Sequence, residues 1–245
     1  MSTHQSTKTG NMEHKSPVMG QTSTDLVVVN LDIIPKLLFE GMVADDAKTV
    51  ETAVENLADL FRLSADKRME AHEAGGHAVL VVTMQKWIRN ESIQTSSCRC
   101  IQNMSCTNTE AKESFACIGG LECIINAMRA YPSSQRVQRS GCGALMNLLS
   151  GSDDDSEMLD AMSQKFVNEY DGIALIVAAM KNYPDEIKIQ LWGNGLFQNL
   201  AQVKEFRREL MRGGAVTAAG ASMEKYPDEG PVLTYAAKFL KLLLV

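Results

Sequence analysis

The sequence lacks the features of a membrane-spanning or secreted chain. Its 245 residues contain no apolar run of about 18 residues and no N-terminal apolar segment of the signal-peptide type. We therefore expect a cytoplasmic or nuclear protein without a membrane partner. In a reducing compartment the six cysteines are expected to be free, small, buried residues. The formal net charge of −6 leaves no general excess of Lys and Arg for neutralising phosphates, so nucleic acid is not the expected partner.

Motifs for catalysis and metal binding are also missing. There is no P-loop, no G-x-S-x-G segment and no catalytic Ser/His/Asp arrangement, and four histidines leave little acid–base chemistry. His72 and His77 stand five residues apart with glycines between them, whereas a zincin helix needs a spacing of about four on one face. The cysteines show no paired C-x2-C spacing. We expect no enzyme activity, no cofactor and no bound metal.

What the sequence does contain is one segment repeated several times. Its copies lie around three methionines and, in weaker form, around a fourth: Met84, Met128, Met180 and Met223. In three copies 16 residues separate an aromatic residue from an asparagine, the pairs being Trp87 and Asn103, Tyr131 and Asn147, and Tyr183 and Asn199. A glycine pair or its remnant precedes each copy: Gly75-Gly76, Gly119-Gly120, Asp171-Gly172 and Gly213-Gly214. Their second members are spaced by 44, 52 and 42 residues, and a period of about 40–47 residues is typical of HEAT and armadillo arrays.

Each copy is predicted to contain three helices. A short polar helix comes first, over 66–74, 110–117, 156–170 and 203–212, and the glycine pair ends it because glycine tolerates the left-handed cap conformation. A second helix, such as 121–130, stops at Tyr-Pro because proline cannot continue a helix. The third helix of the same copy is expected over 135–149. Upstream, residues 49–63 show apolar positions at spacings of three and four and predict an amphipathic helix.

This organisation predicts one elongated domain rather than several globular ones. Residues 1–24 are rich in Ser, Thr and Gln without apolar periodicity and are interpreted as a disordered tail. Residues 25–245 are expected to form the repeat domain. Because an array normally closes with a polar capping unit, the apolar end leaves open whether the array continues. The expected units are 31–75, 76–119, 120–171, 172–213 and 214–245.

The repeated pattern resembles the armadillo repeat. The likeness rests on Gly119-Gly120, the Gly141–Leu145 segment with Asn147, and Gly193, Gly195 and Asn199, and it covers roughly residues 31–245. The resemblance implies an all-α, right-handed α-solenoid of about four to five three-helix repeats. It also implies that the third helices line a concave groove, where the repeated asparagine often hydrogen-bonds the backbone of an extended peptide. Family members that import nuclear cargo have a tryptophan four residues before this asparagine, and Arg99, Gly143 and Gly195 stand there instead, which argues against nuclear import.

Carried over by position, the repeated asparagine corresponds to Asn103, Asn147 and Asn199, with Asp59 as an outlier and no match at Leu242. Helical periodicity then places other polar and aromatic side chains on the same face. The predicted peptide-binding groove comprises Asn103, Asn147, Asn199, Trp192, Arg99, Arg139 and Gln202. Such a face suits a peptide, because amides pair with backbone, arginines pair with carboxylates and tryptophan anchors a side chain. The alternative is that the asparagines tie neighbouring units together, and the two roles can coexist.

The resulting functional hypothesis is a non-catalytic interaction module or scaffold. It would bind an extended peptide segment of a protein partner along its concave groove, as solenoids do with long segments. The alternative hypothesis is a regulatory subunit or adaptor that docks a folded partner, such as a small GTPase or kinase, through a rim or convex patch. A polar groove would favour the first, and an apolar patch on the convex face or edge would favour the second.

Overall fold

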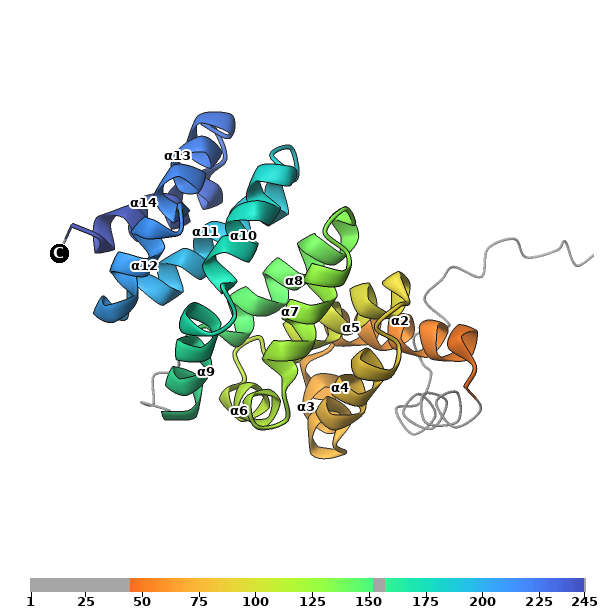
Figure 1. Cartoon of the computed structure of the whole chain (residues 1–245). Helices are drawn as coiled ribbons and strands as arrows, with labels where there is room; N and C mark the ends of the chain where they lie inside the picture. The colour runs from red at the N-terminus through yellow and green to blue at the C-terminus, as the bar shows by residue number, and fades with distance from the viewer. Residues whose placement is uncertain (1–44, 152–156, 245) are drawn as a thin grey trace, which may run out of the picture.

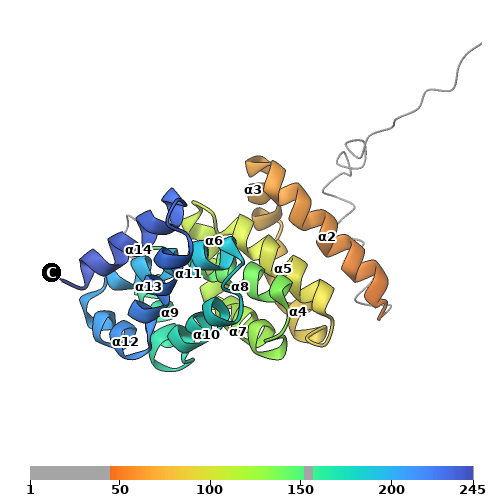
Figure 2. The ribbon, with the colours of Figure 1, turned by 90° about the horizontal axis from the view of Figure 1, so that it is seen from above.

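The described part of the protein, residues 45–151 and 157–244 of a computed structural model, contains helices and no β-strand. Figure 1 shows these helices stacked in series, from α2 at one end to α14 and the C-terminus at the other, and Figure 2 shows the same stack from above. The all-helical solenoid expected from the repeat is therefore confirmed. The expected tail over 1–24 and the start of the array over 25–44 lie outside the described residues.

Three types of helix alternate along the chain. The short first helices are α3 (Ala65–Glu73), α6 (Thr109–Cys117), α9 (Glu157–Asn168) and the pair η2 (Lys204–Phe206) and α12 (Arg207–Arg212). The second helices are α4 (Gly76–Lys86), α7 (Gly120–Ala130), α10 (Gly172–Asn182) and α13 (Ala215–Lys225). The third helices are α2 (Ala47–Leu63), α5 (Glu91–Met104), α8 (Gln135–Leu148), α11 (Ile187–Ala201) and α14 (Gly230–Leu242). Consecutive third helices pack against one another and form the spine of the stack.

The turn between the first and second helices uses the left-handed conformation that the glycine pairs predict. The φ angle is positive at Gly75, Gly119 and Gly214, and also at Asp171, where φ is 47°. In the last copy the positive φ falls on the second glycine of the pair, whereas it falls on the first member in the others. The structural period from Asp171 to Gly214 is therefore 43 residues, one more than the alignment of the second pair members had indicated.

A buried glutamine closes the turn between the second and third helices. The amide of Gln138 donates to the carbonyl oxygens of Met128 at 2.7 Å and of Tyr131 at 3.0 Å, and Gln138 is 3% exposed. Gln94 and Gln190 make the same pair of bonds in their copies. The bond to Met128 satisfies a carbonyl group near the end of the second helix, whereas the Tyr131 carbonyl also accepts from the Ser134 N–H. The equivalent position of the last copy, ten residues after Met223, is Leu233.

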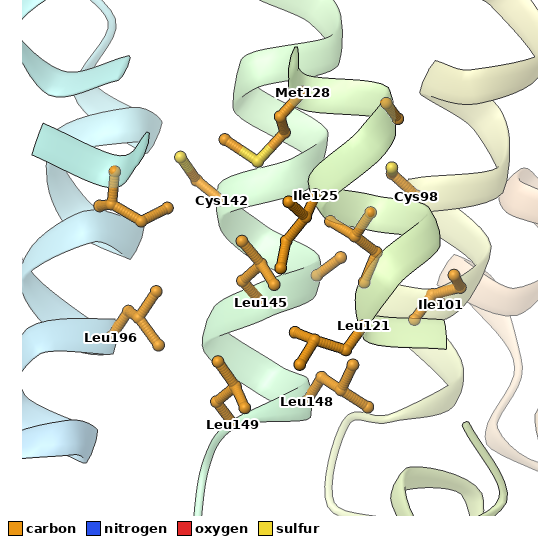
Figure 3. Packing of buried hydrophobic residues seen from close by; sticks show 14 of the residues in the cluster. Cys98, Ile101, Leu121, Ile125, Met128, Cys142, Leu145, Leu148, Leu149 and Leu196 are labelled. Atoms are coloured by element: carbon orange, nitrogen blue, oxygen red, sulfur yellow. The ribbon is translucent and has the colours of Figure 1, made fainter. Parts of the chain in front are cut away.

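The buried residues form one hydrophobic cluster that runs through the stack, and Figure 3 shows the part of it around α7 and α8. A recurring feature is a methionine of the second helix packed onto a glycine of the third. A Cβ atom at Gly141 would lie 2.5 Å from the Met128 side chain, and one at Gly193 would lie 2.5 Å from Met180. Glycine therefore fits both positions best, because any side chain there would have to displace the methionine.

Four of the six cysteines are buried as expected: Cys98, Cys100, Cys123 and Cys142. Burial raises the pKa of the Cys123 thiol to about 11 and that of Cys142 to about 12, so both stay protonated and act as small apolar residues. Cys106 and Cys117 are exposed, and for them the prediction of burial was wrong. Within the described ranges no helix is long and apolar enough to cross a membrane.

Candidate binding groove

The repeated asparagines form a ladder of hydrogen bonds between units. Asn147 Nδ2 donates to the main-chain oxygen of Gln102 at 2.7 Å, Asn199 Nδ2 donates to that of Met146 at 3.1 Å, and Asn103 Nδ2 donates to that of Ala58 at 3.3 Å. Each acceptor lies in the preceding third helix, directly before the residue that corresponds to the asparagine in that helix. The asparagines therefore tie neighbouring units together, and the three side chains are half-buried.

This ladder does not use the whole carboxamide. Within the described residues no hydrogen bond reaches the Oδ1 atoms of Asn103, Asn147 or Asn199. A carbonyl oxygen on an amide can accept bonds from a ligand's N–H groups. The internal bond fixes the orientation of each carboxamide and leaves its acceptor for another partner.

A groove of about 460 Å³ runs across four consecutive third helices. Its walls come from α2, α5, α8 and α11, and its lining residues are Arg62, Thr95, Arg99, Gln102, Asn103, Arg136, Arg139, Ser140, Lys188 and Trp192. It brings together four of the seven residues expected from the sequence: Asn103, Arg99, Arg139 and Trp192. Asn147, Asn199 and Gln202 are not among its lining residues.

The groove is strongly basic in a chain whose net charge is −6. Arg99 forms an ion pair of 2.5 Å with Asp59, and Arg139 lies 3.9 Å from a carboxylate oxygen of Glu186. Glu186 also accepts a hydrogen bond from the Gln135 side chain. Five cationic side chains thus face two carboxylates, so the groove carries an excess of positive charge.

Three of these cations have no carboxylate partner among the described residues. Arg62 and Arg136 are exposed and form no ion pair there. The ammonium of Lys188 lies 5.9 Å from the ring centroid of Trp192, within the range of a cation–π contact. These side chains are therefore available to an anionic ligand.

Arg62, Arg136 and Lys188 were missed in the prediction from sequence, although a signal existed for two of them. From Arg136 to Asn147 and from Lys188 to Asn199 is 11 residues, which is close to three helical turns. The offset therefore places both cations on the asparagine face of their helices. Arg62 stands three residues after Asp59, the outlier of the asparagine series.

The third helices pack closely at the positions four residues before Asn147 and Asn199. A Cβ atom at Gly143 would lie 2.5 Å from the Gln102 amide, and one at Gly195 would lie 2.6 Å from the Met146 side chain. A side chain at either position would have to displace Gln102 or Met146. The groove's aromatic residue is instead Trp192, three residues earlier in α11 than Gly195.

The two histidines that frame Gly75-Gly76 lie side by side. The rings of His72 and His77 lie 5.0 Å apart, and both Nδ1 atoms are buried without a hydrogen-bond partner among the described residues. Over residues 45–151 and 157–244 no group of three or more His, Cys, Asp or Glu side chains is placed to hold a metal ion.

Comparison with known proteins agrees with this architecture. A designed armadillo repeat protein superposes with a TM-score of 0.68 at 20% identity, and the match covers 90% of each chain. A chain of the structure described as "A conserved phosphorylation switch controls the interaction between cadherin and beta-catenin in vitro and in vivo" superposes with a TM-score of 0.71 at 18% identity, covering 90% of this chain and 43% of that one. The fold is therefore an α-solenoid of the armadillo-repeat type.

The sequence itself is similar to one curated protein over part of its length. It is 28% identical over 136 residues to protein aardvark of Dictyostelium discoideum, which is 54% of this chain and 18% of that protein. The match thus spans less than a fifth of that relative. No model of a known protein family matches the sequence.

Proposed function

We propose that this protein is a non-catalytic scaffold that binds an extended peptide segment of a protein partner along the groove of α2, α5, α8 and α11. The observation that carries the proposal is the groove itself, whose polar and cationic walls come from four consecutive third helices. Packed helices lie about 8–10 Å apart, and an extended chain rises about 3.3 Å per residue. A peptide would therefore pass one third helix about every three residues.

The side chains of the groove match the groups that an extended peptide presents. The free Oδ1 of Asn103 can accept from backbone N–H groups, and Thr95 and Gln102 add further polar atoms. Trp192 offers an aromatic surface for one apolar side chain, and buried aromatic anchors dominate many interfaces. Asn147 and Asn199 carry the same free Oδ1 on α8 and α11 outside the lining residues of the groove, so they offer further acceptors to a partner that extends along these helices.

A second candidate function is the docking of a folded partner at the edge of the array. A cleft of about 400 Å³ lies beside α3 and the turn between α5 and α6, lined in part by Met69, Met104 and Thr107. Met69 is 54% exposed, which is high for a large apolar side chain. This edge has both an opening and apolar surface, so it suits the rim footprint of an adaptor.

Peptide selection tests the groove even while the partner is unidentified. A phage library of random 16-residue peptides is selected on the full chain, and the affinity of the enriched peptides is measured by fluorescence polarisation. Trp192→Ala is expected to weaken binding at least about 10-fold, and Asn147→Ala with Asn199→Ala about 10-fold together. Melting temperatures show whether each variant is folded, and Met69→Ala in the second cleft is the matched control.

Two outcomes would contradict this proposal. One is full affinity in a folded protein that carries all three changes at Asn147, Asn199 and Trp192. The other is binding that is lost in Met69→Ala and retained in Trp192→Ala, which would favour docking at the cleft beside α3.

A further inference from the structure

We infer that the groove selects an acidic peptide segment, with Asp or Glu side chains over the arginines of α2, α5 and α8 and an apolar side chain next to them on Trp192. This inference rests on the proposed peptide groove and adds the chemistry of its ligand. It follows from the charges of the lining residues, from their order along the array and from the partners they lack.

The cations are distributed along the path that a peptide would take. Arg62 belongs to α2, Arg99 to α5, Arg136 and Arg139 to α8, and Lys188 to α11. One or two positive charges thus lie on each of four consecutive third helices. Because about three peptide residues span the distance between neighbouring third helices, a fitting peptide carries a carboxylate at about every third position.

Arginine is the residue type that suits this role. Its planar guanidinium offers paired N–H donors that match the two oxygens of a carboxylate. Arg62 and Arg136 make no ion pair with any described residue, so within the described ranges no carboxylate competes with an incoming one at these two positions. Arg99 already holds Asp59 at 2.5 Å, and both side chains remain partly exposed.

The groove can select acidic over basic ligands only if its cations outnumber its internal carboxylates, and they do. Asp59 and Glu186 face five cations. A basic peptide would meet net repulsion, and like charges brought together in an interface are costly. A neutral peptide would leave the guanidinium groups without the strong contacts that they make with carboxylates.

Single-stranded nucleic acid is the other polyanion that arginines and a tryptophan could hold. The structure favours the peptide for two reasons. The chain as a whole is acidic, with a net charge of −6, so its long-range field opposes a polyphosphate. The groove also offers one aromatic ring, Trp192, whereas binding of successive bases uses a series of stacking platforms.

The test begins with the composition of the peptides enriched by selection on the full chain. We expect acidic peptides with an apolar residue beside the acidic run. An enriched peptide is then synthesised in two forms, the original and one with every Asp and Glu replaced by Asn and Gln. The neutral form is expected to bind at least about 10-fold more weakly in low salt, with a smaller difference at high salt.

Charge reversal in the protein gives the reciprocal test. Arg62→Glu with Arg136→Glu is expected to weaken binding of the acidic peptide at least about 10-fold. These two arginines are exposed and have no ion pair to lose among the described residues, so the change disturbs no internal ion pair there. The same variant should bind a peptide with Lys in place of its acidic residues better than the wild type does. Arg208→Glu with Arg212→Glu on α12 is the control for net charge, since this change alters the charge equally at two exposed arginines that do not line the groove.

The outcomes separate this inference from the proposed function. If selection returns neutral or basic peptides, or if the neutral form binds as well as the acidic one and still depends on Trp192, the acidic specificity is wrong and the peptide groove stands. If no selected peptide depends on Trp192 or the arginines, both proposals fail. If a 16-nucleotide oligo(U) displaces the peptide and binds more tightly, nucleic acid replaces the peptide as the ligand.

Discussion

Asn147 donates a hydrogen bond from its side chain to the main-chain oxygen of Gln102, 45 residues earlier, over a distance of 2.7 Å. The bond joins α8 to α5, and Asn103 and Asn199 repeat it one step on either side. A residue expected to contact a ligand therefore also holds the array together. The two roles are compatible, because the internal bond uses the amide nitrogen and leaves the oxygen free.

This ladder makes Asn147 a stability residue even without a ligand. Asn147→Ala should lower the free energy of unfolding by about 0.5–1.5 kcal/mol, the value of a typical hydrogen bond. Asn147→Asp should cost more, because it removes the donor and faces a carboxylate toward the Gln102 carbonyl. Urea denaturation followed by circular dichroism measures both. Asn126→Ala, at an exposed position of α7, is the control, and equal stability of the two alanine variants would contradict the prediction.

The glutamine that closes each turn should contribute more to the stability of the fold than one ordinary hydrogen bond does. Gln138→Leu removes two hydrogen bonds and leaves the carbonyl groups of Met128 and Tyr131 without this partner, so we expect a loss of about 1–3 kcal/mol. The reverse change is available in the last copy, where Leu233→Gln should stabilise by up to about 1 kcal/mol. Urea midpoints of the two variants should move in opposite directions, and a shift in the same direction would show that the last turn is built differently.

Close packing of a methionine on a glycine predicts strong sensitivity to a single methyl group. A Cβ at Gly141 would lie 2.5 Å from Met128, so Gly141→Ala should cost about 1–3 kcal/mol despite the better helix propensity of alanine. Gly220 lies in α13, and a Cβ atom added there would have no heavy atom of the described residues within 4 Å. Gly220→Ala should therefore stabilise by about 0.5–1 kcal/mol. Thermal melts of the two variants should shift in opposite directions.

The left-handed turn before each second helix predicts a contrast between two positions. Gly119 has φ of 83°, where a β-branched residue is strained, so Gly119→Val should cost about 1–3 kcal/mol. Asp171 has φ of 47° at the equivalent turn, so Asp171→Gly should be neutral or stabilise by up to about 1 kcal/mol. A melting temperature that is unchanged in Gly119→Val would mean that this glycine is not needed for the turn.

The histidine pair predicts a dependence of stability on pH. Burial lowers the pKa of His77, and the nearby His72 lowers it further. The unfolded chain then binds more protons than the folded one, so stability should fall as the pH drops below about 6.5 and level off once the pH passes the folded-state pKa. His77→Phe keeps a ring against Phe115 and removes the titrating group. Urea midpoints between pH 7.5 and 5 should decline less in this variant, and an equal decline would assign the effect to other groups.

Much of the architecture could be predicted from the sequence because its signals are local. Periodic apolar residues predicted α7 and α8 to within one residue at each end, and the Tyr-Pro pair marked the turn between them. The glycine pairs predicted a left-handed residue in these turns, because glycine adopts a positive φ without strain. Which member adopts this conformation could not be predicted where both are glycine, and it is the first at Gly75 and Gly119 but the second at Gly214.

The sequence by itself therefore determined that this chain is an array of helices with an asparagine at a fixed place in three of its third helices. Tertiary structure alone decided which atoms those asparagines use and which side chains share a groove. Arg62, Arg136 and Trp192 are far apart in the sequence, and they meet because third helices stack closely where Gly143 faces Gln102 and Gly195 faces Met146. Periodicity reports the face of one helix, whereas the convergence of four helices depends on the spacing and rotation that core packing sets.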